Sequence, residues 1–369
     1  MEPIRVAQVM GYMNGGGVES VVMNYYRHID REKVQFDFIV CEESTLIPRE
    51  EIEGLGGRIF MVPDYKKLPQ YLGALVSLFK REGWHIVHSH MNSLSVFSLY
   101  AAKKAGVPVR IAHSHSTSGN DGFARNMLKN VLRSLSKRYP TNLAACSERA
   151  AEWLFGSDCD CRLFPNGVDT KQFKDAKKRR DIIRSQLGIS EGALVLGHVG
   201  RFAKQKNHAF LLEIFMALKE ISPNTTLLLV GDGPLFSEID YRVQELGLDD
   251  DVLLLGQRDD IPDLLAAMDV FCLPSLYEGL PVVGIECQAA GLPILVSNSV
   301  TQELKKSSFV EFESLESPPK EWANRVLDLA SERELVSSGL EEYDIEKCSA
   351  GLCKYYLDLS AGQRLKLGG

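Results

Sequence analysis

The chain has 369 residues, of which 45% are hydrophobic and 25% are charged. This composition is close to the average of soluble globular proteins, so it excludes collagen-like, coiled-coil and disordered chains. At about 100 to 200 residues per domain, the length predicts two domains, with a cleft between them that could hold a small molecule.

The net charge is −7, from 42 Lys and Arg against 49 Asp and Glu residues. Nucleic-acid binding draws on a basic surface, so this charge argues against such a partner. Residues 1–170 hold 20 basic and 18 acidic side chains and residues 171–369 hold the other 22 and 31, which gives net charges of +2 and −9. The eight cysteines lack zinc-site spacing, and no apolar run reaches membrane-spanning length. We therefore expect a cytoplasmic protein without a signal peptide.

The first half of the chain alternates short apolar runs with helical patterns. Strands are predicted over residues 4–10, 36–41, 59–62, 85–88, 109–112 and 143–146, with a helix near 19–29. This alternation indicates a parallel α/β sheet covered on both faces, in which ligands bind where strands end. The pattern stops at the turn cluster 164–169, and we place a linker over the basic stretch 171–184 that follows.

A second alternating series predicts strands over residues 194–199, 226–230, 252–255, 270–273 and 294–296. Helices are predicted between them over 208–220, 235–246, 261–268 and 282–290, and a last helix covers 345–359. The expected domains are thus 1–169 and 170–344, both Rossmann-like, followed by a C-terminal helix within 345–369 that crosses back to the first domain.

Two loops between a strand and a helix could bind an anion. Gly15-Gly16-Gly17 opens the first helix, where backbone N–H groups can face phosphate oxygens. It matches neither the dinucleotide fingerprint nor the P-loop, and a plain glycine turn is the alternative. The second loop places Arg201 and Lys206 before a helix N-terminus, where a ligand anion would neutralise them; a solvated basic loop is the alternative.

A third segment carries two carboxylates. Glu278 lies in the loop after a predicted strand, and Glu286 lies in the otherwise apolar helix that follows. Burial of a lone acid costs several kcal/mol unless it is paired or binds a ligand. Both acids could therefore face one ligand near the start of this helix.

The order of these motifs resembles the retaining glycosyltransferases of family four, once called group one, over nearly the whole chain. The resemblance rests on the glycine turn, the segment 165–169, the Arg201 and Lys206 pair, the segment 231–234 and the spacing of Glu278 and Glu286. It implies the GT-B architecture of two facing Rossmann-like doubly wound parallel sheets, like that of bacterial capsular and exopolysaccharide glycosyltransferases.

The resemblance also implies roles for individual residues. Arg201 and Lys206 would hold the diphosphate of a nucleotide sugar, Glu286 the ribose, and Glu278 the transferred sugar. The remaining donor contacts implied are Gly16 and Gly17 on the diphosphate, Arg258 and its neighbours on the base, and Gly279, Leu280, Pro281 and Val282 on the sugar.

The family's first domain brings a histidine to the donor sugar, and His113 and His115 are both candidates here. We favour His115 because it lies further past the predicted strand end; a structural hydrogen bond is the alternative. His88 and His90 are expected to be scaffold or acceptor-side residues.

The implied reaction moves a hexose from a UDP- or GDP-sugar to a glycan or lipid-linked acceptor, with retention by a front-face route. No Asp-x-Asp motif stands in the loops expected to bind the donor, so we expect no metal and no other cofactor, with Arg201 and Lys206 taking the metal's role. The alternatives are a GT-B nucleotide-sugar epimerase, a phosphorylase, and a non-catalytic GT-B partner subunit.

The stretch 123–139 predicts an amphipathic helix with basic residues every four positions: Arg125, Lys129, Arg133 and Lys137. Such a face can rest on an anionic bilayer at about 1 kcal/mol per basic residue. Peripheral membrane contact is therefore one expectation, and an ordinary helix packed on the sheet is the other.

Overall fold

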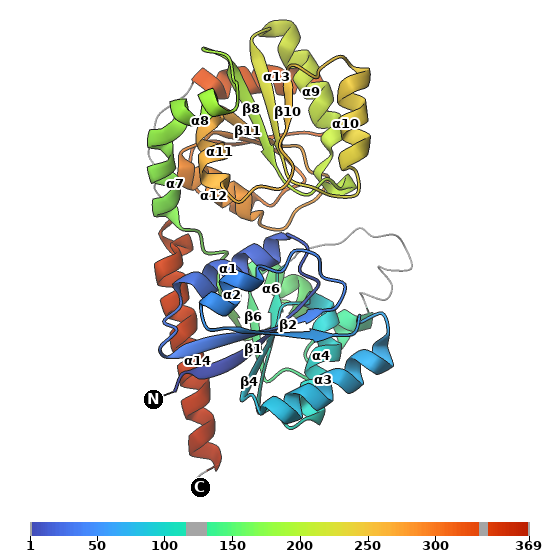
Figure 1. Ribbon diagram of the computed structural model, residues 1–369, viewed down its shortest axis with the longest axis vertical. Coiled ribbons are helices and arrows are strands. Elements are labelled where there is room, and N and C mark those ends of the chain that lie inside the picture. Colours follow the sequence, from blue (N-terminus) through green and yellow to red (C-terminus); the bar gives the residue numbers. More distant parts are fainter. Residues whose placement is uncertain (1, 116–130, 332–338, 368–369) are drawn as a thin grey trace. The chain divides into compact units, whose positions relative to one another are not determined.

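The fold is given by a computed structural model that describes residues 2–115, 131–331 and 339–367. The chain divides into two compact units. Unit 1 comprises Met1–Gly167 and Glu342–Gly369, and unit 2 comprises Val168–Glu341. Each unit is a parallel sheet with helices on both faces (Figure 1).

Unit 1 contains a seven-stranded sheet in the order β3-β2-β1-β4-β5-β6-β7. The strands are β1 Ile4–Gly11, β2 Val34–Cys41, β3 Arg58–Val62, β4 Ile86–Ser89, β5 Val109–Ser114, β6 Asn142–Ala145 and β7 Cys161–Leu163. The helices are α1 Gly17–His28, α2 Arg49–Gly54, α3 Leu68–Glu82, the 3-10 turn η1 Asn92–Leu94, α4 Ser95–Lys104 and α6 Glu148–Phe155. Strand order reverses between β1 and β4, and ligands of doubly wound sheets bind at such a point.

Unit 2 contains a six-stranded sheet in the order β10-β9-β8-β11-β12-β13. The strands are β8 Leu194–Val199, β9 Thr225–Val230, β10 Val252–Leu254, β11 Val270–Leu273, β12 Ile294–Ser297 and β13 Val310–Glu313. The helices are α7 Thr170–Ala176, α8 Arg180–Gln186, α9 His208–Ile221, α10 Phe236–Glu245, α11 Ile261–Ala267, α12 Val282–Ala290 and α13 Pro319–Ser331, with 3-10 turns η2 Lys177–Arg179, η3 Lys204–Lys206 and η4 Gln302–Leu304. The 3-10 turn η5 Glu341–Tyr343 includes the boundary at which unit 1 resumes. In this sheet the strand order reverses between β8 and β11. The loops that follow these two strands carry Arg201, Lys206 and Glu278.

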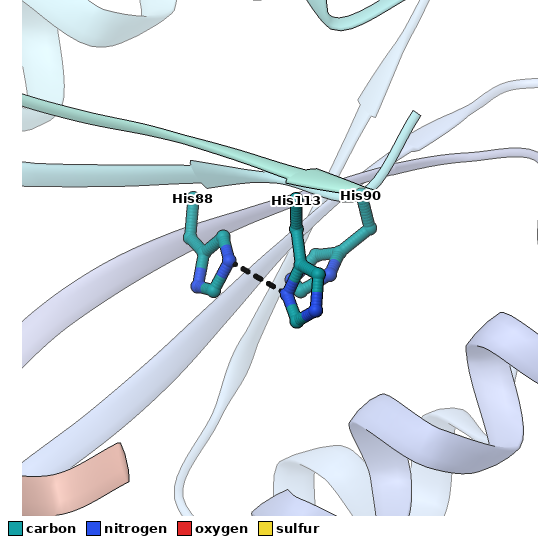
Figure 2. A group of neighbouring side chains, drawn as sticks. All are labelled: His88, His90 and His113. Carbon is teal, nitrogen blue, oxygen red and sulfur yellow. Dashed lines mark hydrogen bonds between the residues drawn. The ribbon is translucent and has the colours of Figure 1, made fainter. Parts of the chain in front are cut away.

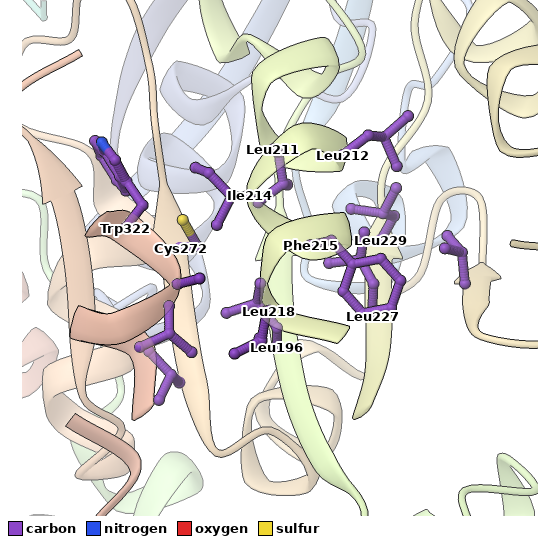
Figure 3. Packing of buried hydrophobic residues seen from close by; sticks show 14 of the residues in the cluster. Leu196, Leu211, Leu212, Ile214, Phe215, Leu218, Leu227, Leu229, Cys272 and Trp322 are labelled. Atoms are coloured by element: carbon purple, nitrogen blue, oxygen red, sulfur yellow. The ribbon is translucent and has the colours of Figure 1, made fainter. Parts of the chain in front are cut away.

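The core of unit 2 lies between this sheet and α9 (Figure 3). Leu211 and Phe215 of α9 are fully buried, together with Leu196 of β8 and Leu227 of β9. Trp322 of α13 belongs to the same cluster. Full burial of such a side chain contributes about 1.5–3 kcal/mol, so this core holds the strand ends and their loops in fixed positions.

The stretch predicted as a linker is helical instead. It forms α7 and α8, which pack against α12 and α11. Its basic residues have a structural partner: Arg180 and Arg184 lie 2.7 and 2.5 Å from the two carboxylate oxygens of Asp269. The segment lacks a long apolar stripe because its helices are short, and the ion cluster at Asp269 holds α8 next to the start of β11.

The last helix, α14 Ile345–Leu367, is part of unit 1 and packs against α1. It places the fully buried Tyr356 beneath the sheet. No helix within the described residues combines the length and the apolar character that crossing a membrane requires.

The predicted basic helix is only partly described. Arg125 and Lys129 lie outside the described residues, whereas residues 131–134 are helical and Lys137 is exposed. The guanidinium of Arg133 lies 4.9 Å from the ring centroid of Trp153. Arg133 therefore packs on an indole ring and does not belong to an exposed basic face.

Candidate active site

Two loops of unit 2 are joined at the ends of neighbouring strands. β8 pairs with β11 in parallel, so the β8–α9 and β11–α12 loops leave the same edge of the sheet. The backbone N–H of Leu276 donates to the carbonyl of Gln205 at 2.8 Å, and the Gln205 side chain donates to the carbonyl of Tyr277 at 2.9 Å. Asn207 donates to the carbonyl of Pro274 at 3.2 Å. These bonds bring together motifs that lie about 70 residues apart in sequence.

The central contact of these loops is an ion pair. Nζ of Lys206 lies 2.6 Å from Oε1 of Glu278, and their side chains are only 15% and 10% exposed. The hydroxyl of Ser275 donates to the same carboxylate at 3.1 Å. A pair this shielded is weakly screened by salt, so its geometry is well defined and costly to break on one side only.

Arg201 is held in place by glycines of the next loop, the β9–α10 loop. A Cβ atom at Gly231 would lie 2.1 Å from the carbonyl oxygen of Gly200, and one at Gly233 would lie 2.5 Å from that of Phe202. A side chain at position 231 or 233 would therefore clash, and glycine at both positions lets the β9–α10 loop contact the backbone on either side of Arg201. Within the described residues, the exposed Arg201 side chain forms no hydrogen bond or ion pair, so its charge is available to a ligand.

Glu286 lies in the first half of α12, which begins at Val282. Burial raises the pKa of Glu286 to about 7. No hydrogen-bond or salt-bridge partner for it is present in the described part of the chain, and ligand hydroxyl groups would supply what it lacks. The first N–H groups of α12 have no partner within the helix, so this end of α12 presents donors next to Glu278 and Gly279.

Arg258 lies in the loop after β10 and is exposed. Its guanidinium donates to both carboxylate oxygens of Asp260, at 2.8 and 2.6 Å. This hydrogen-bonded pairing raises the pKa of Arg258. Its charge is therefore neutralised locally, and a contact to a base would come from the backbone of this loop.

The glycine turn of unit 1 has an internal ligand. The carboxylate of Glu19 accepts hydrogen bonds from the N–H groups of Gly15 and Gly16, at 2.6 and 2.8 Å, and so caps α1. Sequence reasoning treated these groups as open to phosphate, whereas the structure shows an anion of the chain itself on them. Gly17 begins α1 directly behind this cap.

Four histidines of unit 1 form one cluster at the ends of β4 and β5. The structure brings His113 and His115 together with His88 and His90, which sequence reasoning kept apart as scaffold or acceptor-side residues. Figure 2 shows His88, His90 and His113. Nε2 of His88 lies 3.0 Å from Nδ1 of His113, and Nδ1 of His90 lies 2.8 Å from Nε2 of His115. The rings of His113 and His115 stack with centroids 3.9 Å apart.

Two further side chains complete this network. The Tyr356 hydroxyl lies 2.6 Å from Nδ1 of His88, and Oε1 of Gln8 lies 2.8 Å from Nε2 of His90. The amide of Gln8 also donates to the Tyr356 oxygen at 3.2 Å. Burial lowers the pKa of each histidine, that of His115 to about 3, so all four rings are neutral at pH 7.

These contacts also assign the tautomers. The Tyr356 oxygen accepts from the Gln8 amide, so the Tyr356 hydroxyl donates to Nδ1 of His88. The proton of His88 is then on Nε2, which donates to Nδ1 of His113. His90 donates from Nε2 to Gln8 and accepts from His115 at Nδ1. His113 is left with an N–H group at Nε2, and His115 with a lone pair at Nδ1.

Gln8 and Tyr356 are the residues that sequence reasoning missed. The signal for the cluster is the tripeptide His-Ser-His, which occurs at 88–90 and again at 113–115. Alternation along a strand turns both histidines of each tripeptide to one face and the serine to the other. Ser89 and Ser114 indeed bond elsewhere, to Ser98 and to the Ala150 carbonyl. No sequence signal marks Tyr356, which α14 supplies.

Two family models match most of the chain. The model described as Glycosyltransferase Family 4 matches residues 15–172, and the model described as Glycosyl transferases group 1 matches residues 179–331. Together they follow the two series of strands and helices in the order in which the sequence predicts them.

Similar proteins cover most of the chain. EpsF of Bacillus subtilis, named as a glycosyltransferase, is 39% identical over 95% of this chain and 96% of its own. The UDP-Gal:alpha-D-GlcNAc-diphosphoundecaprenol alpha-1,3-galactosyltransferase of Escherichia coli is 31% identical over 80% of this chain and 79% of its own. The capsular polysaccharide biosynthesis glycosyltransferase CapH of Staphylococcus aureus is 27% identical over 96% of this chain and 99% of its own.

Among solved structures, HepE of Anabaena in complex with UDP-glucose superimposes with a TM-score of 0.77. It is 19% identical, with 96% of this chain and 99% of that chain covered. This similarity confirms the predicted GT-B class of two doubly wound parallel sheets.

Proposed function

The chain belongs to glycosyltransferase family 4, the retaining group 1 enzymes that use nucleotide sugars, and we propose that it transfers a hexose from a UDP-sugar to a lipid-linked sugar during surface polysaccharide synthesis. The observation that carries the proposal is the pairing of Lys206 with Glu278, in loops that also carry Arg201, which has no partner in the described part of the chain. Two cations for a diphosphate and a carboxylate for sugar hydroxyls support this function.

Unit 2, residues 168–341, is the proposed donor-binding unit. Arg201 and Lys206 bind the diphosphate, Glu286 accepts hydrogen bonds from the ribose hydroxyls, and Glu278 accepts them from the sugar. The N–H groups of Gly279 to Val282 contact the same sugar, and the backbone around Arg258 contacts the base. UDP is favoured over GDP because the names of the E. coli relative and of the HepE complex both contain a UDP-sugar.

Unit 1 is the proposed acceptor-side unit. His115 contacts the transferred sugar with its Nδ1 lone pair, which accepts from a sugar hydroxyl, and His113 stacks behind it and orients its ring. Gly16 and Gly17 contact the diphosphate once the Glu19 carboxylate releases the turn. Loss of this helix cap costs about 1 kcal/mol, which reduces the free energy gained when the glycine turn contacts the diphosphate.

The proposed reaction breaks the bond between the anomeric carbon and the diphosphate oxygen. The bond to the acceptor oxygen forms on the same face, and the acceptor proton passes to the departing diphosphate. Negative charge grows on the diphosphate as the bond breaks, and fixed cations aimed at it stabilise the transition state more than the ground state. Arg201 and Lys206 supply this stabilisation without a metal ion.

The proposed acceptor is a sugar linked to a polyprenyl diphosphate, and the reaction would take place at the cytoplasmic face of the membrane. The name of the E. coli relative contains such an acceptor. Unit 1 also carries the basic residues Arg125, Lys129 and Lys137, which would attract anionic lipids.

Nucleoside diphosphate release tests the function directly. Purified protein is incubated with UDP-glucose, UDP-galactose, UDP-N-acetylglucosamine or GDP-mannose, with and without N-acetylglucosaminyl-diphosphoundecaprenol. We expect UDP release with one UDP-sugar, stimulated by the acceptor, and a lipid product enlarged by one hexose. Conversion of the donor to its epimer without transfer would support the epimerase instead. Absence of turnover with every donor would support a non-catalytic subunit.

A further inference from the structure

We propose that His88, His90 and His113 form a binding site in unit 1 for a divalent transition-metal ion of the zinc class. The ion itself takes no part in the proposed transfer, although His113 also stacks against His115, the histidine proposed to contact the sugar. The ion would stabilise unit 1 by joining the ends of β4 and β5.

The backbone brings these ligands together. β4 and β5 are parallel neighbours, with His88 opposite Ile111 and Ser89 opposite Ala112. Each strand therefore delivers one His-Ser-His tripeptide to the same edge of the sheet. One ring nitrogen of each of His88, His90 and His113 lies within 4.8 Å of the other two. Within the described residues, this is the sole group of three or more His, Cys, Asp or Glu side chains with that spacing.

The distances suit an ion of zinc's size. At zinc–nitrogen distances of about 2.0–2.1 Å, two ligand nitrogens of a tetrahedral site lie about 3.3 Å apart. Nε2 of His88 and Nδ1 of His113 are already 3.0 Å apart. The ligand nitrogens of the three rings all lie within 4.8 Å of one another, so rotation of the His90 side chain would have to bring its nitrogen closer to the other two.

One buried atom has no partner in the network. Nε2 of His113, a residue only 3% exposed, forms no hydrogen bond. A buried imidazole nitrogen left in this state costs about 1–3 kcal/mol. Coordination through Nδ1 leaves this N–H without a partner in the described part of the chain, so it is the spacing of the three rings that favours the ion.

The hydrogen bonds that His88 and His90 form to Tyr356 and Gln8 are of the kind that metal-bound histidines form. A ligating imidazole donates its other N–H to an acceptor, which fixes its tautomer. Oε1 of Gln8 already accepts from Nε2 of His90, so Nδ1 carries the lone pair. The Tyr356 hydroxyl, which can donate or accept, stands 2.6 Å from Nδ1 of His88 and can accept its N–H when Nε2 binds the ion.

The residues around the three histidines favour one class of metal ion. The small cavity beside the cluster is lined by the four histidines with Gln8, Val21, Val22, Tyr25, Phe36, Phe164, Leu352 and Tyr356 and holds no carboxylate. Magnesium and calcium need oxygen ligands, whereas zinc, copper and nickel bind imidazole well. A water-derived hydroxide in the fourth position would lower the net charge of the site.

Metal binding to the full chain tests the proposal. Protein without a histidine tag is freed of metal with a chelator and dialysed against Zn²⁺ in the presence of excess Mg²⁺. We expect one tightly bound zinc per chain and a melting temperature that rises by several degrees. The variants His88→Gln and His113→Gln should lose this equivalent and the rise, and the control His28→Gln, in the same unit but outside the cluster, should keep both.

Cobalt distinguishes histidines from the eight free cysteines. Co²⁺ bound by imidazole nitrogens shows weak visible bands and lacks the intense near-ultraviolet absorption of a cobalt–thiolate bond. Absence of a bound ion in the wild type would overturn the proposal even if a variant failed to fold. A thiolate spectrum, or zinc retained by folded His113→Gln, would overturn it as well. None of these readouts depends on transferase activity.

Discussion

The ammonium of Lys206 lies 2.6 Å from the carboxylate of Glu278, so the two residues proposed to bind opposite parts of the donor are bound to each other. Each holds the other in a defined position and compensates its charge. Because this pair is mostly buried, removal of one partner leaves an uncompensated charge. Single variants at these positions should thus affect both activity and stability, and the two must be measured separately.

We expect Lys206→Ala and Arg201→Ala each to lower kcat by about 10²–10³, because each removes a fixed charge that stabilises the leaving diphosphate. Turnover at saturating UDP-sugar measures this effect. Lys204→Ala is the matched control, since Lys204 is an exposed cation in the same 3-10 turn. Near-normal kcat in both test variants would show that the diphosphate is bound elsewhere.

Glu286 and Glu278 should differ in what they bind. Glu286→Gln should weaken binding of UDP itself, whereas Glu278→Gln should leave UDP affinity nearly unchanged and impair use of the UDP-sugar. Calorimetry with UDP alone, compared with the kinetics of the UDP-sugar, separates the two effects. Equal losses of UDP affinity in both variants would contradict these assignments.

UDP binding should depend on pH through Glu286, whose pKa is raised to about 7 by burial. Ribose hydroxyls donate to the ionised carboxylate, so affinity should fall about tenfold from pH 8 to pH 6 as the group is protonated. The Glu286→Gln variant should lack this dependence. A flat wild-type profile would contradict the assignment.

The same shift has an opposite effect on stability. Between pH 4.5 and about 7 the folded chain holds a proton on Glu286 that the unfolded chain has lost. Stability from this group therefore falls as pH rises through that window, by at most about 3 kcal/mol. Urea unfolding of wild type and Glu286→Gln across this range measures the difference.

Transfer should continue in the presence of EDTA, because Arg201 and Lys206 stabilise the diphosphate and the donor loops carry no carboxylate pair with metal-ligand spacing. Rates with EDTA, with Mg²⁺ and with Mn²⁺ check this. Loss of activity in EDTA that Mg²⁺ or Mn²⁺ restores would contradict it. Zinc bound by the unit 1 histidines affects thermal stability and leaves this prediction unchanged.

Removing the Glu19 carboxylate should strengthen UDP binding several-fold, because it frees the N–H groups of Gly15 and Gly16 for the diphosphate. The Glu19→Ala variant should also lose about 1 kcal/mol of stability with its helix cap. Glu43→Ala, an exposed acid of the same unit, controls for the change in net charge. Unchanged or weaker UDP binding in folded Glu19→Ala would exclude a role of this turn in diphosphate binding.

Sedimentation with vesicles tests membrane contact. We expect the wild type to pellet with anionic vesicles at low salt, since each basic residue near such a surface contributes about 1 kcal/mol. Combined replacement of Arg125, Lys129 and Lys137 by Gln should abolish this. Arg133→Gln should have little effect because its guanidinium packs on Trp153. A wild type that stays in the supernatant would favour a soluble acceptor.

The amino-acid sequence by itself determined the two parallel sheets and the loops that carry Arg201, Lys206, Glu278 and Glu286. Apolar strands of covered sheets and turns after them are local signals, and the order of the motifs indicated the family. Sequence analysis missed β7, β13 and α13, whose short or mixed patterns stand out little from their neighbours, and it gave no bounds for α2, α3, α4 and α6. It also took α7 and α8 for a linker, because Asp269, the partner of α8, lies far along the chain.

Only the tertiary structure decided which side chains meet. The ion pair of Lys206 and Glu278 depends on β8 and β11 being neighbours, although β9 and β10 separate them in sequence. The histidine network depends likewise on the pairing of β4 with β5 and on a tyrosine from the last helix. Periodicity reports which face of an element is buried, whereas contact between distant elements is a property of strand order and packing. Local pattern therefore predicts where functional side chains lie along each element, and the fold decides which ones act together.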